Sequence, residues 1–384
     1  MKGVIISKIL KVAWLGSGFI NRSASGTAQT AQKAVEYLSR NHSDKIEITI
    51  LVKSLSDALV AQKDQNLSKC KIELLDNRKR RFLASSRQYY RYCWQNRRNK
   101  VFDVLHFSVP RVYPFYYWFP AKKFVATFHA AGDITVPVDK FIFSKHVYNT
   151  IIKLQWRKFD AIIADSDFAV NEISNAYKIP YTKISKIFVG ADTLWGLTDA
   201  NISQKTQKVV IMGRWQKYKN VHTALMALFE LNKCLTNPLK VTLIGKSNQL
   251  GKELVQKVVD KFHEDDIELI EYLSNLDLAK AYREAMLVIH PSINEGFGLP
   301  AFEAFGEGST IIVHSETPAA ELLTKFPGVI VENLETVHGM KQAVHKSQLN
   351  FSISINQRRS YITSIGATWE HMSSAYLRTY LELF

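Results

Sequence analysis

Two glutamates flank a glycine-containing loop in the second half of the chain. Glu295 follows an apolar run, Met286–Ile289. Glu303 comes eight positions later, after Pro300. The apolar run predicts a buried strand, and Pro300 favours the first turn of a helix. The loop therefore falls at the carboxyl end of a strand, where open α/β sheets bind ligands. Two carboxylates there predict a site for hydroxyl groups; the alternative is a helix start with two solvated glutamates.

Two cations occupy the corresponding place after an earlier strand, which the sequence predicts over Lys208–Met212. Arg214 and Lys219 lie between that strand and a helix predicted to end near Leu231. Both positive charges and the amides of a helix N-terminus can converge on one diphosphate group. The turn is therefore predicted to bind phosphate.

Both segments resemble motifs of one enzyme family. The loop resembles the paired-glutamate signature of retaining glycosyltransferase family 4, in the glycosyl transferases group 1, over Glu295-Gly296-Phe297-Gly298-Leu299-Pro300 and Glu303-Ala304. The turn resembles the Gly-Arg and Lys-Asn motif of the same family. The resemblance is dense over residues 205–325 and looser over 100–192. It implies an α/β protein of the GT-B fold, in which two Rossmann-like domains with parallel sheets face a central cleft.

The resemblance also implies a role for each matching residue. Arg214 and Lys219 would bind the donor diphosphate, Glu303 the ribose hydroxyls, and Glu295 the sugar hydroxyls. Four residues of the loop would line the donor beside them: Gly296, Phe297, Gly298 and Leu299. The family retains the anomeric configuration, with the departing phosphate as base, so no protein nucleophile is assigned. Because the two cations stabilise the leaving group, no metal is expected.

Three further positions match the family more weakly. His129 follows a strand predicted over Lys123–Phe128, where the family has a histidine near the sugar and phosphates; the usual next aspartate is replaced by alanine here. Gly26 opens a predicted helix, where amides can bind phosphate, although the family often has two glycines. Tyr272 ends a predicted strand that contacts the nucleobase in the family. We expect all three in the site.

A possible metal pair follows the strand predicted over Ala161–Ala164. Asp165 and Asp167 form an Asp-x-Asp sequence, and hard divalent cations favour paired carboxylates. The same residues open a helix predicted over 168–177, and aspartate and serine cap such starts. The family has serine in place of Asp165. We expect the helix start rather than a metal site.

Excess positive charge is concentrated in the first half of the chain. Residues 1–192 hold 31 of the 50 lysines and arginines but 15 of the 35 acids. Residues 78–100 and 111–120 combine basic and aromatic side chains. In the first segment, Tyr89, Tyr90 and Trp94 would share one helical face, which is typical of helices at an anionic membrane surface. The alternatives are aromatic packing into the core and RNA stacking; no nucleic acid partner is expected.

Length and hydropathy set the organisation. A chain of 384 residues predicts two domains, here 1–195 and 196–360, with a last helix in 361–384 that crosses back to the first. No apolar run is long enough to span a membrane, and no signal peptide is predicted. Three scattered cysteines indicate no metal site. We expect a cytoplasmic protein attached peripherally to the inner face of the membrane.

The sequence thus predicts a retaining hexosyltransferase. Its donor would be GDP-mannose or a UDP-sugar, and its acceptor lipid-linked or an oligosaccharide, in surface polysaccharide or lipopolysaccharide assembly. A related enzyme with a soluble acceptor and a sugar-nucleotide epimerase are the closer alternatives. A non-catalytic basic module that binds membrane or RNA is a remote one, because it leaves Arg214, Lys219, Glu295 and Glu303 unexplained.

Overall fold

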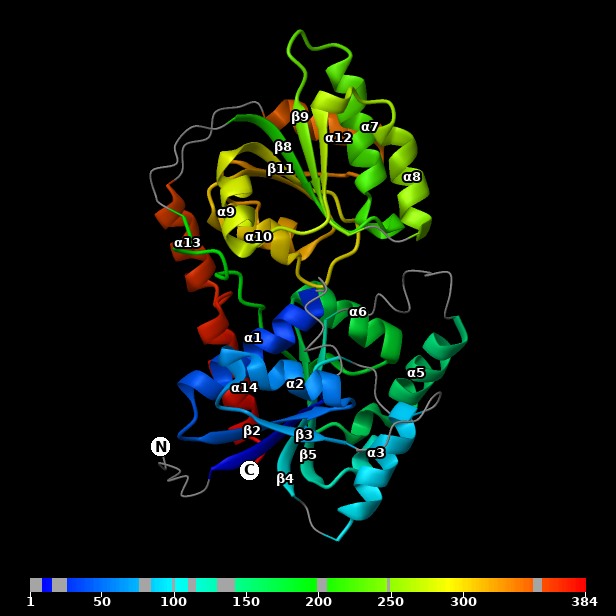
Figure 1. The fold of residues 1–384 in the computed structure, drawn as a ribbon, viewed down its shortest axis with the longest axis vertical. Coiled ribbons are helices and arrows are strands. Elements are labelled where there is room, and N and C mark those ends of the chain that lie inside the picture. Colours follow the sequence, from blue (N-terminus) through cyan, green and yellow to red (C-terminus); the bar gives the residue numbers. More distant parts are fainter. Residues whose placement is uncertain are drawn as a thin grey trace. The chain divides into compact units, whose positions relative to one another are not determined.

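The computed structural model describes residues 9–15, 26–75, 84–98, 101–109, 115–129, 142–198, 206–246, 249–347 and 354–384. The chain forms two compact units, shown in Figure 1. The first unit holds residues 1–188 together with 369–384, and the second holds 189–368.

The first unit is built on a parallel sheet with the strand order β3-β2-β1-β4-β5-β6-β7. β4 is buried along its whole length and β5 from Phe124 to Phe128, which explains why these stretches read as continuous apolar runs. The strands are β1 (Leu10–Leu15), β2 (Ile46–Val52), β3 (Lys71–Leu74), β4 (Phe102–Phe107), β5 (Ala121–Phe128), β6 (Ala161–Ala164) and β7 (Ile184–Lys186).

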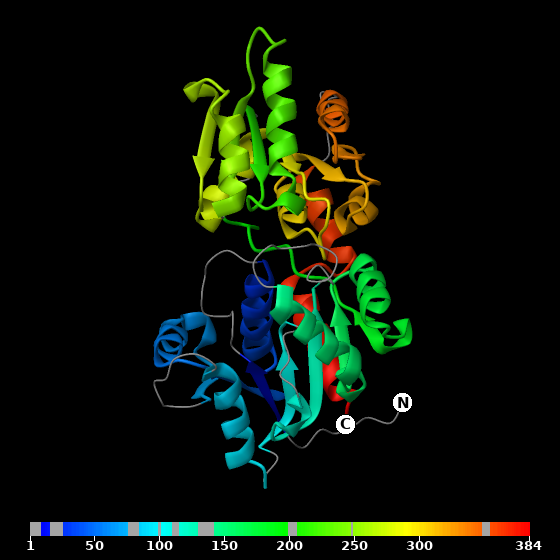
Figure 2. The ribbon, with the colours of Figure 1, turned by 90° about the vertical axis from the view of Figure 1, so that its right-hand side faces the viewer.

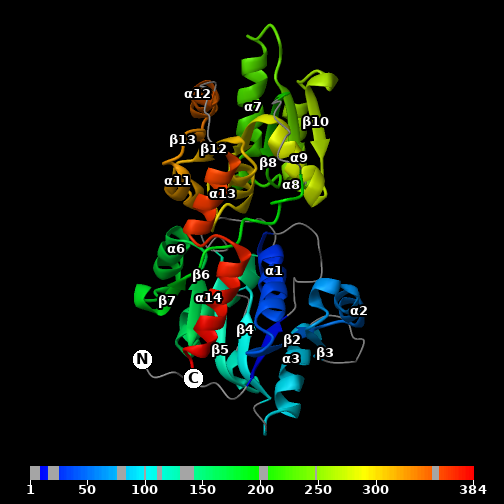
Figure 3. The same cartoon turned by 90° about the vertical axis from the view of Figure 1, so that its left-hand side faces the viewer.

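Helices cover both faces of this sheet. Figures 2 and 3 look at opposite faces: α3 and α5 lie on one, and α1 and α14 lie side by side on the other. The described helices are α1 (Gly26–Asn41), α2 (Leu55–Lys63), α3 (Ala84–Gln95), α5 (Ile142–Gln155), α6 (Asp167–Tyr177) and α14 (Trp369–Leu381). Single turns stand at η1 (Gln65–Leu67), η2 (Tyr116–Trp118), η3 (Trp156–Lys158) and η4 (Tyr181–Lys183).

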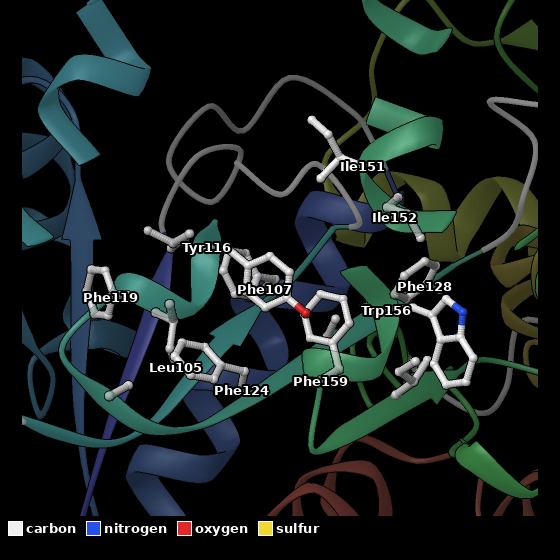
Figure 4. Packing of buried hydrophobic residues seen from close by; sticks show 14 of the residues in the cluster. Leu105, Phe107, Tyr116, Phe119, Phe124, Phe128, Ile151, Ile152, Trp156 and Phe159 are labelled. Atoms are coloured by element: carbon white, nitrogen blue, oxygen red, sulfur yellow. The ribbon is translucent and has the colours of Figure 1, made fainter. Parts of the chain in front are cut away.

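An aromatic cluster fills the core on the α3 and α5 side (Figure 4). Tyr116 and Phe119, from the aromatic segment predicted over 111–120, are fully buried in it, whereas Phe115 and Trp118 are exposed. The segment therefore divides between the core and the surface, which the sequence left open. Residues 110–114 lie outside the described part.

The predicted aromatic face of α3 is partly wrong. Tyr89 and Tyr92 are buried because both rings stack on Phe119, at centroid distances of 5.5 and 5.2 Å. Trp94, expected on the same face as Tyr89, is 65% exposed instead. Helix α3 thus packs its tyrosines into the core and turns a tryptophan outward; the basic run at 78–81 lies outside the described residues.

The second unit repeats the architecture, with the strand order β10-β9-β8-β11-β12-β13 and all neighbours parallel. The strands are β8 (Thr206–Met212), β9 (Lys240–Ile244), β10 (Ile267–Ile270), β11 (Ala285–His290), β12 (Thr310–His314) and β13 (Val329–Glu332). Helices α7 (Val221–Asn232), α8 (Gln249–Val259) and α12 (Val337–Ser347) lie on one face. The other face carries α9 (Asn275–Glu284), α10 (Leu299–Gly306) and α13 (Ile355–Ser364); α11 (Pro318–Leu323), η5 (Lys217–Lys219) and η6 (Glu264–Asp266) complete the unit.

The unit boundaries differ from the predicted division at 195/196 and 360/361. The connecting segments pack within the second unit: the Ala191 amide donates to the Ala367 carbonyl at 2.9 Å, and the Arg359 guanidinium lies 5.4 Å from the Trp195 ring centroid. Only helix α14 of the C-terminal region joins the first unit. Among the described residues, no helix combines the length and apolarity needed to cross a bilayer.

Candidate functional site

The strand order of the second sheet reverses between β8 and β11. From β8 the chain adds strands toward one edge of the sheet, and from β11 it adds them toward the other edge. At such a switch point the loops after the two strands diverge and leave room for a ligand. Here the two loops meet at their bases, where the Ile293 amide donates to the Tyr218 carbonyl at 2.9 Å. The fold therefore brings together the phosphate-binding turn and the glutamate loop that the sequence predicts.

The turn after β8 keeps its shape because a neighbouring position has no side chain. A Cβ atom on Gly245 would lie 2.1 Å from the Gly213 carbonyl oxygen, so only glycine fits. This close approach lets the Gly213 amide donate to the Ile244 carbonyl at 3.0 Å. The backbone that carries Arg214 is thereby fixed against β9.

The far end of the turn is fixed by Asn220. Its backbone is left-handed, with φ at 53°, and its side-chain amide donates to the Leu334 carbonyl at 2.6 Å. Asparagine tolerates this conformation better than most residues. Helix α7 starts at the next residue, so Lys219 stands just before a helix N-terminus.

Glu295 is the centre of a small charged cluster. Its Oε1 accepts from the Lys219 ammonium and lies 3.3 Å from His290 Nε2. Burial by itself would raise the pKa of Glu295, but Lys219 and His290 outweigh it and hold that pKa well below the usual range. Glu295 is therefore an anion whose two protein partners come from both sides of the switch point.

In the loop after Glu295, the backbone can contact a ligand, whereas the apolar side chains are buried in the protein. Gly298 has φ at +89° and ends the loop at the start of α10, a conformation that favours glycine. The Phe297 ring stacks on Phe302 at a centroid distance of 4.3 Å, and Leu299 is buried. Of the predicted donor contacts in this loop, Phe297 and Leu299 have only their backbone to offer.

Glu303 lies inside α10 and is almost fully buried. Its carboxyl makes no hydrogen bond or ion pair within the described part of the chain. Burial, together with the charge of Glu307, raises the pKa of Glu303 to about 8. The buried Tyr282 hydroxyl nearby also lacks a partner among the described residues, and burial and Glu303 raise its pKa. The site thus holds a buried acid with a raised pKa and unused hydrogen-bonding capacity.

A buried ion network supports the C-terminal end of α10. The Glu307 carboxylate pairs with Arg283 at 2.7 Å and with Arg359 at 2.6 Å. Arg359 also donates to the Gly306 carbonyl at 3.0 Å. Both oxygens of Glu307 are used, which assigns Glu307 a structural role and leaves Glu303 as the helix's free carboxyl.

Tyr272 is not brought to this cluster. It follows β10, the edge strand, which β9 separates from β8, and its side chain is 71% exposed. A contact between Tyr272 and a nucleobase remains a prediction.

The first unit places His129 at the carboxyl end of β5, as predicted. Its Nδ1 lies 2.6 Å from Asp165 Oδ2, and its Nε2 lies 3.0 Å from the Ser108 carbonyl oxygen. Gly26 is the first residue of α1, and a Cβ atom there would meet nothing within 4 Å. The loop before Gly26, residues 16–25, lies outside the described part.

The two aspartates of the possible metal pair have separate partners. Asp165 pairs with His129, whereas Asp167 pairs with the Lys186 ammonium at 2.6 Å. Ser166 between them caps α6 by accepting from the Ala169 amide at 3.0 Å. The helix-start interpretation of this segment is therefore confirmed. The described residues contain no group of three or more His, Cys, Asp or Glu side chains able to hold a metal ion.

Two site residues were missed at the sequence level. His290 reads as the polar end of an apolar strand, and only its place beside Glu295 gives it a role. Asp165 was considered only as a metal ligand or a helix start, and its pairing with His129 joins residues 36 positions apart.

Comparison with known proteins finds a family match that covers most of the second unit. Residues 198–359 match the family model of the glycosyl transferases group 1. The O-antigen chain mannosyltransferase RfbU of Salmonella typhimurium is 24% identical over 189 residues, which cover 48% of this chain and 50% of RfbU. The chain spans half or less of the length of the curated relatives it matches.

Solved structures resemble nearly the whole chain. Sucrose-phosphate synthase from Thermosynechococcus elongatus gives a TM-score of 0.73 at 13% identity, over 98% of this chain and 99% of that one. HepE of Anabaena in complex with UDP-glucose gives 0.65 at 14% identity, over 97% and 98%. At such low identity the likeness concerns the fold, which is GT-B with two Rossmann-like α/β units.

Proposed function

We propose, on the premise that residues 198–359 belong to the glycosyl transferases group 1, that the chain is a retaining hexosyltransferase of family 4. The donor is a nucleoside-diphosphate sugar, GDP-mannose or a UDP-sugar. The acceptor is a lipid-linked sugar or an oligosaccharide in the assembly of surface polysaccharide or lipopolysaccharide. The name of RfbU, an O-antigen chain mannosyltransferase, supports this choice of donor sugar and pathway.

One observation carries the proposal: Lys219 and Glu295 meet at the switch point of the second sheet. Lys219 offers a positive charge for a diphosphate, beside a helix N-terminus that also favours anions. Glu295 offers oxygens for sugar hydroxyls. A nucleoside-diphosphate sugar has both groups next to each other, so one ligand satisfies both residues.

Donor binding replaces the ion pair between Lys219 and Glu295 by a contact of Lys219 with the diphosphate and a contact of Glu295 with the sugar hydroxyls. The diphosphate competes with Glu295 for the Lys219 ammonium. Glu295 then keeps His290 and accepts from the sugar hydroxyls, while Glu303 receives the ribose hydroxyls. Among the described residues Glu303 has no partner that favours its charged form, and burial and Glu307 raise its pKa. Hydroxyl donors lower that pKa and ionise the group on binding.

The transfer step needs charge stabilisation more than a protein base. As the bond between the anomeric carbon and the diphosphate oxygen breaks, negative charge collects on the leaving group. Arg214 and Lys219 neutralise that charge. The acceptor hydroxyl attacks from the same face and passes its proton to the departing phosphate, so the configuration is retained. Two cations suffice for this task, and we propose that transfer is metal-independent.

The assay for this function measures sugar transfer and donor hydrolysis with radiolabelled GDP-mannose and UDP-sugars, with and without EDTA. We expect transfer in EDTA, loss of transfer in Arg214→Ala and Lys219→Ala, and a product with the anomeric configuration of the donor. Full activity in both variants would exclude the assigned site. Isomerised nucleotide sugar without transfer would indicate an epimerase, and strict dependence on Mg²⁺ or Mn²⁺ would overturn metal independence.

A peripheral membrane contact is the second part of the proposal. Phe115 and Trp118 stack at a centroid distance of 4.8 Å and are both exposed. Gln155, at the end of α5, accepts from the Phe115 amide at 3.1 Å, and Leu154 beside it in the sequence is exposed. Exposed cations accompany these side chains: Lys153, Arg157 and Lys158. Aromatic side chains bordered by lysine and arginine fit the interface of an anionic leaflet.

Vesicle sedimentation tests this surface. The wild type should co-sediment with vesicles that contain anionic phosphatidylglycerol and remain in the supernatant with neutral ones. A variant with Phe115→Ser and Trp118→Ser should lose most of the binding. Equal recovery of wild type and variant in the supernatant with anionic vesicles would exclude this surface as the membrane contact.

A further inference from the structure

The His129 ring has both nitrogens next to an acceptor. The Ser108 carbonyl oxygen, 3.0 Å from Nε2, can only accept, so Nε2 carries a hydrogen. At Nδ1 the partner is Asp165 Oδ2, at 2.6 Å. If Asp165 is ionised it also only accepts, and Nδ1 carries a hydrogen as well. The geometry then describes an imidazolium held by a carboxylate.

The carboxyl of Asp165 is buried against the His129 ring. Asp165 is 3% exposed, and its second oxygen, Oδ1, has no hydrogen-bond partner in the described part of the chain. A buried carboxylate requires a cation, because burial without one is costly. Among described residues the structure pairs Asp165 with His129 alone, since Lys186 is engaged by neighbouring Asp167.

Among the described residues, the other titratable groups that face this pair, His106 and Tyr376, are neutral. His106 on β4 is fully buried, and burial, reinforced by the charge of His129, lowers the pKa of His106 to about 3. Its Nδ1 lies 2.6 Å from the Tyr380 hydroxyl, and its Nε2 lies 2.8 Å from Thr127 Oγ1. Tyr376 of α14, which interacts with Asp165, has its pKa raised far above 10 by burial. Within the described part of the chain, His129 and Asp165 are therefore a charged pair with neutral titratable neighbours.

We propose that Asp165 fixes His129 as an imidazolium cation, and that this cation serves the reaction through its charge and transfers no proton. Both N–H groups are used inside the protein, so the ring cannot donate to or accept from a substrate. Its partly exposed edge instead attracts phosphoryl oxygens of a bound substrate. Asp165 is then a positioning residue that acts through His129. The part of the inference that concerns substrate rests on the proposed function; the charge state does not.

Burial and pairing act in opposite directions on the ring. Burial alone would lower the pKa of His129, but Asp165 and the Ser108 carbonyl raise it above the ordinary value. The family resemblance implies serine in place of Asp165, and serine supplies no such charge. The ion pair between His129 and Asp165 is therefore not implied by the family resemblance.

Nitrogen-15 spectra of histidine-labelled full-length protein test the charge state without any assay of transfer. At about pH 7.5, one unit above the ordinary histidine pKa, His129 should have two protonated ring nitrogens, and buried His106 only one. The signal is assigned by its loss in His129→Gln. A wild-type His129 with one bare nitrogen at this pH would overturn the proposal. The number of protonated nitrogens is read from the wild type, so it can be measured even if a variant fails to fold.

Paired variants test the role of Asp165. In Asp165→Asn, His129 should lose its second proton by about pH 7.5, and kcat/KM should fall about tenfold or more relative to the wild type as the pH rises from about 5.5 to about 8. Asp167→Asn, which breaks only an exposed ion pair, should match the wild type in spectrum and pH profile. A wild-type pH profile in Asp165→Asn would overturn the electrostatic role. An inactive wild type with a doubly protonated His129 would instead count against the proposed function, and leave the charge assignment confirmed.

Discussion

Lys219 and Glu295 lie 76 positions apart in the sequence, and their side chains form an ion pair across the switch point of the second sheet. Glu295 also lies 3.3 Å from His290 Nε2, so the pair is part of a small charged cluster. Both are mostly buried, with 17% and 14% of their side chains exposed. The pair links the two loops of the candidate site, and we propose that a donor engages both of its charges.

Removing the Lys219 charge should abolish most of the transfer. Lys219→Met should lower kcat/KM by about 10²–10³, the range measured when one electrostatic contact to a transition state is removed. The exposed Lys217, in the same turn, provides the matched control, and Lys217→Met should stay close to wild type. Steady-state kinetics with both variants checks this, and equal losses in the two would mean that only general positive charge matters.

His290 should matter for the recognition of the sugar. It is buried and supplies the second donor to Glu295, so its loss lets that carboxylate turn. His290→Phe, which fills the space without a donor, should raise the donor KM about tenfold and weaken discrimination between epimeric donor sugars. His290→Gln keeps an N–H donor and should retain more of both. Identical kinetics for the two variants would rule out a role of this hydrogen bond.

Glu303 should make stability fall as the pH rises. With a folded pKa of about 8 against an ordinary 4.5, the folded state keeps a proton that the unfolded chain releases between those values. Stability from this group is therefore complete below pH 4.5 and is lost as the pH rises toward 8. Glu303→Gln stays neutral, so its Tm should exceed that of the wild type by several degrees at about pH 9 and by less at about pH 5.

The control for this measurement is the exposed Glu316→Gln, which should follow the wild type at every pH. Calorimetric scans across the range give the comparison. A constant Tm difference between Glu303→Gln and the wild type would contradict the raised pKa. The same variant should bind nucleoside diphosphates more weakly, because glutamine cannot become the anion that accepts the ribose hydroxyls.

Gly245 should not tolerate even one methyl group. Gly245→Ala places a Cβ atom 2.1 Å from the Gly213 carbonyl oxygen, so the turn that carries Arg214 must move. We expect a loss of about 1–3 kcal/mol in the free energy of unfolding, as for other overpacked sites. Gly26→Ala meets nothing within 4 Å and should leave the stability unchanged or slightly higher. Denaturant unfolding of both variants distinguishes a steric effect from a general effect of alanine.

The strands were readable from sequence because parallel strands buried on both faces are continuous apolar runs. Ala161–Ala164 is found with the predicted bounds, and β11 extends the predicted run by one residue at each end. Pro300 opens α10 as expected. These features depend on local chemistry alone, so a local pattern suffices to find them.

Contacts between distant residues were not readable in the same way. The helical pattern of α3 does not reveal that Tyr89 and Tyr92 stack on Phe119 while Trp94 is exposed. Nor does the sequence around His290 show that Glu295 folds back onto it. Both outcomes depend on which loops the sheet order places together, and that order is a property of the whole unit.

Binding of nucleoside diphosphates tests the central claim most directly. Thermal unfolding of the wild type with GDP and with UDP, at concentrations far above a micromolar Kd, should show a higher Tm with one of them, since a bound ligand stabilises the folded state. Arg214→Ala and Lys219→Ala should lose most of that shift, and Lys217→Met should keep it. A wild type that neither nucleotide stabilises, or an equal shift in all four proteins, would contradict a donor site at Lys219 and Glu295.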